Sequence, residues 1–194
     1  MLQKNRHMSK KLEVGVLYLR DYSLSLSGRE IARRINVNHQ TALTVLNELV
    51  KEKILLSKTE GRNKKYSFNK KDLRTKLFLQ MAETYKAELF LHNVELRMII
   101  SHLLPLAETI VVFGSFAKGL EKESSDLDLI VIGAADKEGI KKAPNSFPRE
   151  ISMEFRTWKE FAEALSKKIP LALEIQKDHL VYGNVFNAVE VYCR

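Results

Sequence analysis

The chain has 194 residues, which suits one large domain or two small ones, and its formal net charge is +8. A hydrophobic content of 45% with few Pro and Gly excludes a fibrous or disordered chain, and no apolar run approaches the roughly 20 residues that span a bilayer. The N-terminus has no apolar signal-peptide core and the single cysteine cannot form an internal disulfide, so we expect a soluble cytoplasmic protein without a membrane partner.

The first third of the chain carries the whole basic excess. Residues 1–75 contain 17 Lys and Arg against 7 Asp and Glu, whereas residues 76–194 contain 15 against 17. This uneven distribution indicates a polyanionic partner for the first third alone. A basic face that serves only solubility would give the same counts, so that interpretation stays open.

The same region predicts three helices followed by a β-hairpin. Apolar residues recur at helical spacing, Ser27 and Glu30 suit a capping box, and Asn38 can cap the next helix. Gly61 lies in a polar turn between two short segments and tolerates the positive φ of a hairpin. The expected helices and strands lie at residues 10–20, 27–35, 39–53, 54–59 and 65–68.

The segment REIARRINVNHQTALTVLNELVKEKIL, at residues 29–55, has the order short helix, turn, longer helix, apolar strand. It resembles the winged-helix variant of the helix-turn-helix, and the likeness covers about residues 8–69. This resemblance implies that the start of the longer helix reads base edges in the major groove, through His39, Gln40, Thr41 and Thr44. It also implies that the hairpin turn contacts phosphates, through Arg62, Asn63, Lys64 and Lys65.

DNA is the expected partner of this region, with RNA as the alternative. Gln40 is suited to a bidentate pair with adenine. A winged helix that serves only protein contacts or dimerisation would have the same sequence pattern, so the partner is left open at this point.

Residues 71–104 contain neither Gly nor Pro, and their apolar positions recur mostly three and four apart. This spacing predicts one long helix or two joined helices, ended by Pro105. The apolar stripe would dock on the last third of the chain or form a dimer seam. Because paired winged helices commonly read two half-sites, we expect a homodimer.

The last third contains two segments that together predict a metal and phosphate site. Residues 108–113 are an apolar strand that runs into Gly114 and Ser115, where backbone amides favour an anion, with Lys118 one turn on. Asp126 and Asp128 open the next apolar strand, and because side chains alternate along a strand, both carboxylates point to one side. Two adjacent carboxylates favour a hard divalent cation, Mg²⁺ or Mn²⁺.

The stretch FGSFAKGLEKESSDLDLIVI, at residues 113–132, resembles the nucleotidyltransferase superfamily of DNA polymerase β, especially its minimal bacterial and archaeal members. The shared pattern is Gly-Ser, a spacer of ten residues, then Asp-x-Asp. The resemblance implies transfer of a nucleoside monophosphate, with AMP from ATP favoured, to a hydroxyl of a protein, an RNA end or a small molecule. Minimal members often pair with a separate helical toxin-like protein, which makes such a protein one candidate acceptor. A Gly-Ser turn followed by a merely polar strand start is the structural alternative.

The family usually supplies a third carboxylate, generally Asp, from a later strand. Residues 150–157 have the pattern of that strand, and the matching position is Glu154, as a metal ligand or as the base for the attacking hydroxyl. The alternative is that Glu154 is an exposed strand residue and the third acid is lost. Lys118 also stands where the family frequently has Arg, which grips phosphate in a bidentate manner.

We therefore predict an α+β protein with three parts. These are a winged helix of three helices and a hairpin at residues 1–70, a helical connector at 71–105, and a nucleotidyltransferase fold with a mixed β-sheet flanked by helices at 106–194. The predicted function is metal-dependent nucleotidyl transfer coupled to DNA binding. The alternative is a transcriptional regulator whose weak or inactive transferase fold senses a nucleotide or binds a partner.

Overall fold

The computed structural model of the protein describes residues 2–134, 136–142 and 147–194. Contacts divide the chain into two compact units, and the division falls inside helix α4 (Leu73–Phe90), between Ala82 and Glu83. In the described part of the chain, every helix is too short or too polar to cross a membrane. The predicted boundaries at residues 70 and 105 stay a prediction.

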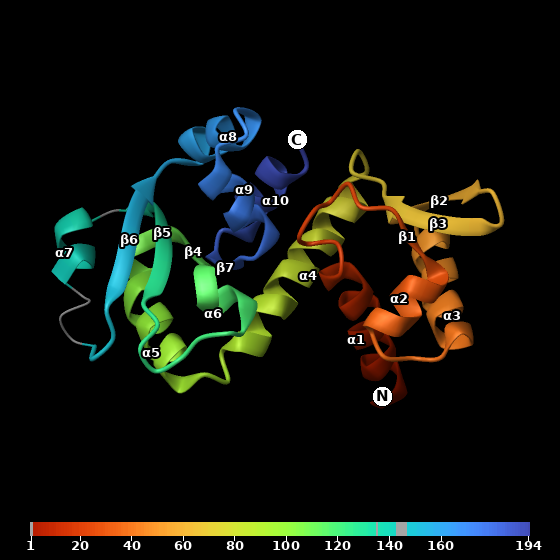
Figure 1. Cartoon of the computed structure of the whole chain (residues 1–194), viewed down its shortest axis with the longest axis horizontal. Helices are drawn as coiled ribbons and strands as arrows, with labels where there is room; N and C mark the ends of the chain where they lie inside the picture. The colour runs from red at the N-terminus through yellow and green to blue at the C-terminus, as the bar shows by residue number, and fades with distance from the viewer. Residues whose placement is uncertain (1, 135, 143–146) are drawn as a thin grey trace. The chain divides into compact units, whose positions relative to one another are not determined.

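The first unit contains three helices, a small antiparallel sheet and the beginning of α4 (Figure 1). Its sheet has the strand order β1-β3-β2, in which Tyr66 pairs with Leu26 on one side and Ser57 on the other. The hairpin turns at Gly61, whose φ is +60°. Its elements are α1 (Leu2–Val16), β1 (Leu26–Ser27), α2 (Gly28–Arg34), α3 (His39–Lys51), β2 (Leu55–Glu60) and β3 (Asn63–Phe68).

Local sequence signals determine where these helices begin. Ser27 Oγ accepts from the amide of Glu30 at 3.2 Å, but the Glu30 carboxylate pairs with Arg34 instead of closing the capping box. The side chain of Asn38 accepts from the amide of Thr41 at 2.8 Å, as predicted. Helix α3 then buries four apolar residues, Ala42, Val45, Leu46 and Leu49. The order of three helices and a hairpin agrees with the sequence pattern, while the assignment to the winged-helix class stays a prediction.

Aromatic side chains pack in the core of the first unit. Tyr18 is fully buried, its hydroxyl donates to the carbonyl oxygen of Tyr66 at 2.9 Å, and its ring centroid lies 4.8 Å from that of Phe68. Gly15 of α1 permits a close approach to α4, because a Cβ there would lie 2.9 Å from side-chain atoms of Phe78 and Ala82.

Residues 73–103 form two helices, α4 and α5 (Val94–Leu103), and not one long helix. The break has a local cause, because the side chain of Asn93 accepts from the amide of Leu96 at 3.0 Å and so caps α5. Pro105 lies inside a 3₁₀ turn, η1 (Leu104–Leu106), that leads directly into the next strand. The homodimer, which was expected because paired winged helices commonly read two half-sites, stays a prediction.

The second unit is an α+β fold around a four-stranded mixed sheet, as predicted, with the strand order β6-β5-β4-β7 (Figure 1). Strand β4 pairs antiparallel with β5 and β7, and β5 pairs parallel with β6. The two central strands are almost entirely buried, which explains their continuous apolar sequence. The further elements are β4 (Ala107–Phe113), α6 (Gly114–Lys118), β5 (Leu127–Ala134), α7 (Lys137–Lys142), β6 (Ile151–Arg156), α8 (Trp158–Ser166), α9 (Pro170–Lys177), β7 (Leu180–Gly183) and α10 (Val185–Tyr192).

Candidate functional site

The Gly114 turn lies directly against one of the predicted carboxylates. Strand β4 passes into α6 without a linker, and Phe113, its last residue, pairs with Asp128 of β5. Gly114 has a φ of +70°, and a Cβ at this position would collide with the Asp128 carboxylate. Glycine is therefore required here both by the backbone conformation and by the close approach of a charged side chain.

The two predicted carboxylates lie at the start of β5. Asp126 is exposed and immediately precedes the strand, whereas Asp128 is half-buried within it. Burial raises the pKa of the Asp128 carboxyl above its usual value of 3.8, and the negative charges of Asp126 and Glu174 raise it further. The carboxylates are thus close enough to repel one another, and a cation between them would relieve that repulsion.

This donor set fits a magnesium or manganese ion. In proteins, Mg²⁺ is commonly held by one or two carboxylates together with the phosphates of a substrate. Asp126 and Asp128 provide two carboxylates beside a glycine turn that lets a phosphate approach the backbone. Within residues 2–134, 136–142 and 147–194, no group of three His, Cys, Asp or Glu side chains gathers as a ready-made metal site.

Lys118, the predicted phosphate contact, faces an acid that sequence analysis missed. It is the last residue of α6, and its Nζ lies 3.0 Å from Glu174 Oε1 on α9. The side chains are 33% and 60% exposed, so this pair contributes little to stability. Glu174 lies in an ordinary amphipathic helix, where no local signal distinguishes it.

Glu154 lies on β6, on the same side of the sheet as Asp128 but farther along. In the parallel register, Ser152 is opposite Asp128 and Glu154 is opposite Ile130. Glu154 forms an ion pair with Arg156 at 2.7 Å and lines a small cavity of about 120 Å³ with residues of α8 and α9. The structure therefore does not gather Glu154 with the aspartate pair into one metal-binding group, and its catalytic role stays a prediction.

On the first unit, residues from both sets of predicted nucleic-acid contacts line a hollow of about 200 Å³. His39 from the start of α3 faces this hollow together with Arg62, Asn63 and Lys64 from the hairpin. Arg29 of α2 joins them, although sequence analysis did not select it. A hollow bordered by so many donors has the chemistry for a phosphate group.

The other predicted nucleic-acid contacts of this unit are exposed, or are partly buried and paired with another side chain. Gln40, Thr41 and Thr44 are exposed on α3, and the Thr44 hydroxyl donates to the carbonyl oxygen of Gln40 at 3.1 Å. Lys65 is half-buried and pairs with Glu60 at 3.0 Å. The charge of Lys65 is thus partly neutralised, which makes Arg62 and Lys64 the stronger candidates among the predicted phosphate contacts of the hairpin.

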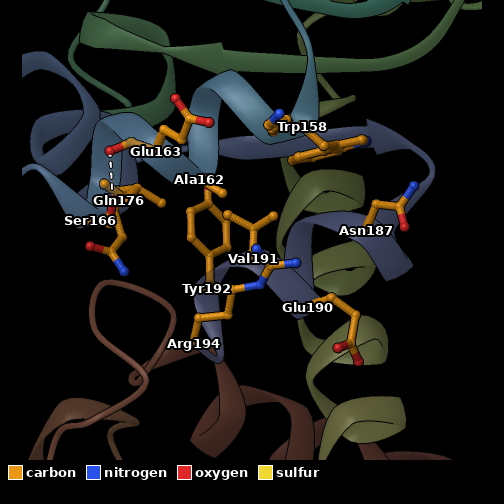
Figure 2. A pocket seen from close by; sticks show the side chains of 12 residues that line it. Trp158, Ala162, Glu163, Ser166, Gln176, Asn187, Glu190, Val191, Tyr192 and Arg194 are labelled. Carbon is orange, nitrogen blue, oxygen red and sulfur yellow. Dashed lines mark hydrogen bonds between the residues drawn. The ribbon is translucent and has the colours of Figure 1, made fainter.

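A larger cavity of about 830 Å³ lies between α8, α9 and α10 of the second unit (Figure 2). Trp158 and Asn187 both donate to Glu108 Oε1, at 3.3 and 2.8 Å. None of the residues predicted to bind nucleotide or metal lines this cavity.

A match to a known protein family lies within the second unit, over the residues of the candidate site. Residues 94–182 match a family model described as a nucleotidyltransferase domain. The matched range contains the glycine turn, the aspartate pair, Lys118, the candidate third acid Glu154, and Glu174. No curated protein and no solved structure matches the chain significantly. The match supports a nucleotidyltransferase domain over residues 94–182 and nucleotidyl transfer as its general activity.

Proposed function

We propose that this protein is a metal-dependent nucleotidyltransferase that moves a nucleoside monophosphate, with AMP favoured, from a nucleoside triphosphate to a hydroxyl acceptor. The observation that carries the proposal is the contact between the Gly114 turn and the Asp128 carboxylate, inside the range that matches the nucleotidyltransferase family. This contact places a backbone that accepts a phosphate next to a carboxylate that accepts a cation, which is the combination that nucleotidyl transfer needs.

Each residue of the site would have a separate role in the transfer. The backbone at Gly114 and Ser115 would hold the triphosphate, and the ammonium of Lys118 would leave Glu174 to pair with a phosphate oxygen. Asp126 and Asp128 would hold the metal ion. When bound, a divalent cation would neutralise charge on the departing pyrophosphate and favour ionisation of the attacking hydroxyl. Glu154 or Glu174 would draw the proton from that hydroxyl.

The proposal is tested by incubating the protein with each labelled nucleoside triphosphate and Mg²⁺, then separating protein, RNA and small molecules. Label is expected in one of these fractions, and the double variant Asp126→Asn/Asp128→Asn should abolish it. The fraction that carries the label identifies the acceptor class, including a separate protein acceptor supplied in the reaction. Label absent from all three fractions would favour the alternative function.

The alternative is a regulator whose transferase fold senses a nucleotide without turnover. Two observations favour it: no three-carboxylate group gathers within residues 2–134, 136–142 and 147–194, and Glu154 is paired with Arg156. In that case the protein would bind a triphosphate with Mg²⁺ and release it unchanged. Equilibrium dialysis with labelled triphosphate, alongside the transfer assay, separates the two functions.

Lys118→Met is expected to raise KM for the triphosphate about tenfold, which corresponds to about 1.4 kcal/mol of binding free energy. The physical reason is that a phosphate contact is lost, whereas the exposed pair with Glu174 contributes little by itself. Steady-state kinetics at saturating Mg²⁺ measure the effect. Lys167→Met, which removes an exposed lysine at the end of α8, should leave KM unchanged. An unchanged KM in Lys118→Met would assign Lys118 to the Glu174 pair alone.

We further propose that the first unit binds duplex DNA through α3 and the hairpin. Arg62→Ala and Lys64→Ala are each expected to weaken binding and to reduce the slope of log K against log salt by about one. Fluorescence anisotropy at a series of salt concentrations measures both. Lys10→Ala is the matched control, because Lys10 pairs with Glu13 on α1 and does not line the hollow. A flat salt response of the wild type would contradict phosphate contacts.

A further inference from the structure

Arg149 is the centre of a set of contacts beside the candidate active site. Its Nε and Nη2 both bind Glu95 Oε2, in the first turn of α5, at 2.9 and 2.8 Å. Its Nη1 donates to the carbonyl oxygens of Lys122 and Glu123, each at 3.2 Å, and to that of Ser125. The Arg149 side chain is only 13% exposed, so these bonds are largely shielded from water.

The three carbonyl groups belong to the loop between α6 and β5, which ends at Asp126. The carbonyl of Ser125 is part of the peptide that joins it to Asp126, so a bond to this oxygen orients the backbone from which the Asp126 side chain extends. Within the loop, the amide of Lys122 donates to Ser125 Oγ at 2.9 Å, and the amide of Ser125 donates to the Lys122 carbonyl at 3.0 Å. Those two bonds form a turn within the loop. The guanidinium of Arg149 then connects this turn to Glu95 of α5.

The same guanidinium also contacts α6. It lies 4.9 Å from the centroid of Phe116, the residue that follows Ser115 in the glycine turn. One planar group thus joins α5, α6 and the Asp126 loop. Arginine suits this position, because its rigid fork of five donors binds several acceptors while its face stacks on a ring. Lysine is a point charge with three donors and cannot reproduce the stack and the fork together.

We propose that Arg149 is a positioning residue, which holds the carbonyl groups of Lys122, Glu123 and Ser125 so that the Asp126 carboxylate stands beside that of Asp128. Its role in turnover rests on the proposed nucleotidyl transfer, whereas its role in loop geometry does not. Residues that orient metal ligands from behind typically change metal affinity or activity by about 10–100-fold when they are altered.

The test compares Arg149→Lys and Glu95→Gln with the wild type. Glu95→Gln leaves the arginine in place but weakens the ion pair that holds it on α5. The proposal can therefore still be tested with this variant if Arg149→Lys fails to fold. Arg97→Lys, an exposed position on α5, is the matched control. Three measurements are made: hydrogen exchange of the segment 120–127, Mn²⁺ affinity by electron paramagnetic resonance, and kcat and KM with Mg²⁺ and triphosphate. Trp158 fluorescence in urea verifies that the second unit is folded.

In Arg149→Lys, exchange in segment 120–127 is expected to accelerate, while β4 and residues 128–134 of β5 keep their protection. The Kd for Mn²⁺ should rise and kcat should fall, each by about 10–100-fold, with KM for the triphosphate nearly unchanged. Glu95→Gln should give the same changes to a smaller extent, and Arg97→Lys none. Wild-type exchange and wild-type Mn²⁺ affinity in a folded Arg149→Lys variant would overturn the inference.

These outcomes separate the two proposals. A wild type that transfers no nucleotide defeats the proposed function, yet faster exchange in Arg149→Lys still supports the positioning role. An active wild type whose Arg149→Lys variant exchanges no faster defeats the positioning role alone.

Discussion

Asp128→Asn is expected to lower nucleotidyl transfer by at least about 10²–10³-fold, as the loss of one charged group that stabilises a transition state typically does. The metal-free variant should nevertheless be at least as stable as the wild type. The reason is that Asp128 is half-buried and faces the charges of Asp126 and Glu174, so its own negative charge is unfavourable without a cation. Loss of activity with no loss of stability would distinguish a metal ligand from a structural residue.

The pH dependence of this effect has a defined sign. Because folding raises the pKa of Asp128 above 3.8, the stabilising contribution of its protonated form is complete below that pH and is lost as the pH rises through the folded-state pKa. Asparagine cannot ionise and avoids this loss. The free energy of unfolding of Asp128→Asn should therefore equal or exceed that of the wild type at neutral pH, and the difference should vanish under acid conditions.

Urea denaturation followed by Trp158 fluorescence measures these stabilities, with EDTA present. Repeating it with Mn²⁺ should stabilise the wild type, since a ligand that binds only the folded state raises its stability, and should stabilise Asp128→Asn much less. Glu138→Gln, an exposed acid on α7, is the matched control and should behave as the wild type in every assay. Retention of transfer activity by Asp128→Asn would contradict the proposed site.

Glu83→Ala is expected to destabilise the second unit by about 3–5 kcal/mol, the usual consequence of breaking a buried ion pair. Glu83 of α4 and His179 before β7 are both fully buried, and Glu83 Oε1 lies 3.0 Å from His179 Nε2. His179 Nδ1 lies 3.1 Å and 3.0 Å from the carbonyl oxygens of Ile175 and Gln176. Because a carbonyl only accepts, Nδ1 carries a proton, and the carboxylate and Nε2 share a second one.

Two further variants test this account of the pair. Glu83→Gln should be milder, because the amide can donate to Nε2 of a neutral imidazole whose Nδ1 keeps its proton. Replacing both partners, as in Glu83→Leu/His179→Leu, should recover much of the stability, because neither member of the pair then leaves the other buried without its partner. Trp158 is the single tryptophan of the chain and lies in α8, so its fluorescence in urea reports the second unit. A double variant no more stable than Glu83→Ala would contradict the account.

The sequence alone determined the features that depend on neighbours along the chain. The Asn38 cap, the turn at Gly61 and the buried strands β4 and β5 were predictable, because each follows from residues a few positions apart. Side-chain alternation along a strand is likewise enough to predict that Asp126 and Asp128 point to the same side. These local signals were sufficient to indicate the nucleotidyltransferase domain that the family match over residues 94–182 supports.

Only the tertiary structure identified the partners of those residues. Lys118 meets Glu174 across 56 positions, Arg149 reaches Ser125 across 24, and Glu83 binds His179 across 96. Each of these pairs depends on strand order and on how helices pack over the sheet, and side-chain alternation or helical spacing carries no information about either. The strand that contains Glu154 was predictable from the sequence. The position of Glu154 relative to the aspartate pair was not, because it depends on the register of β6 against β5.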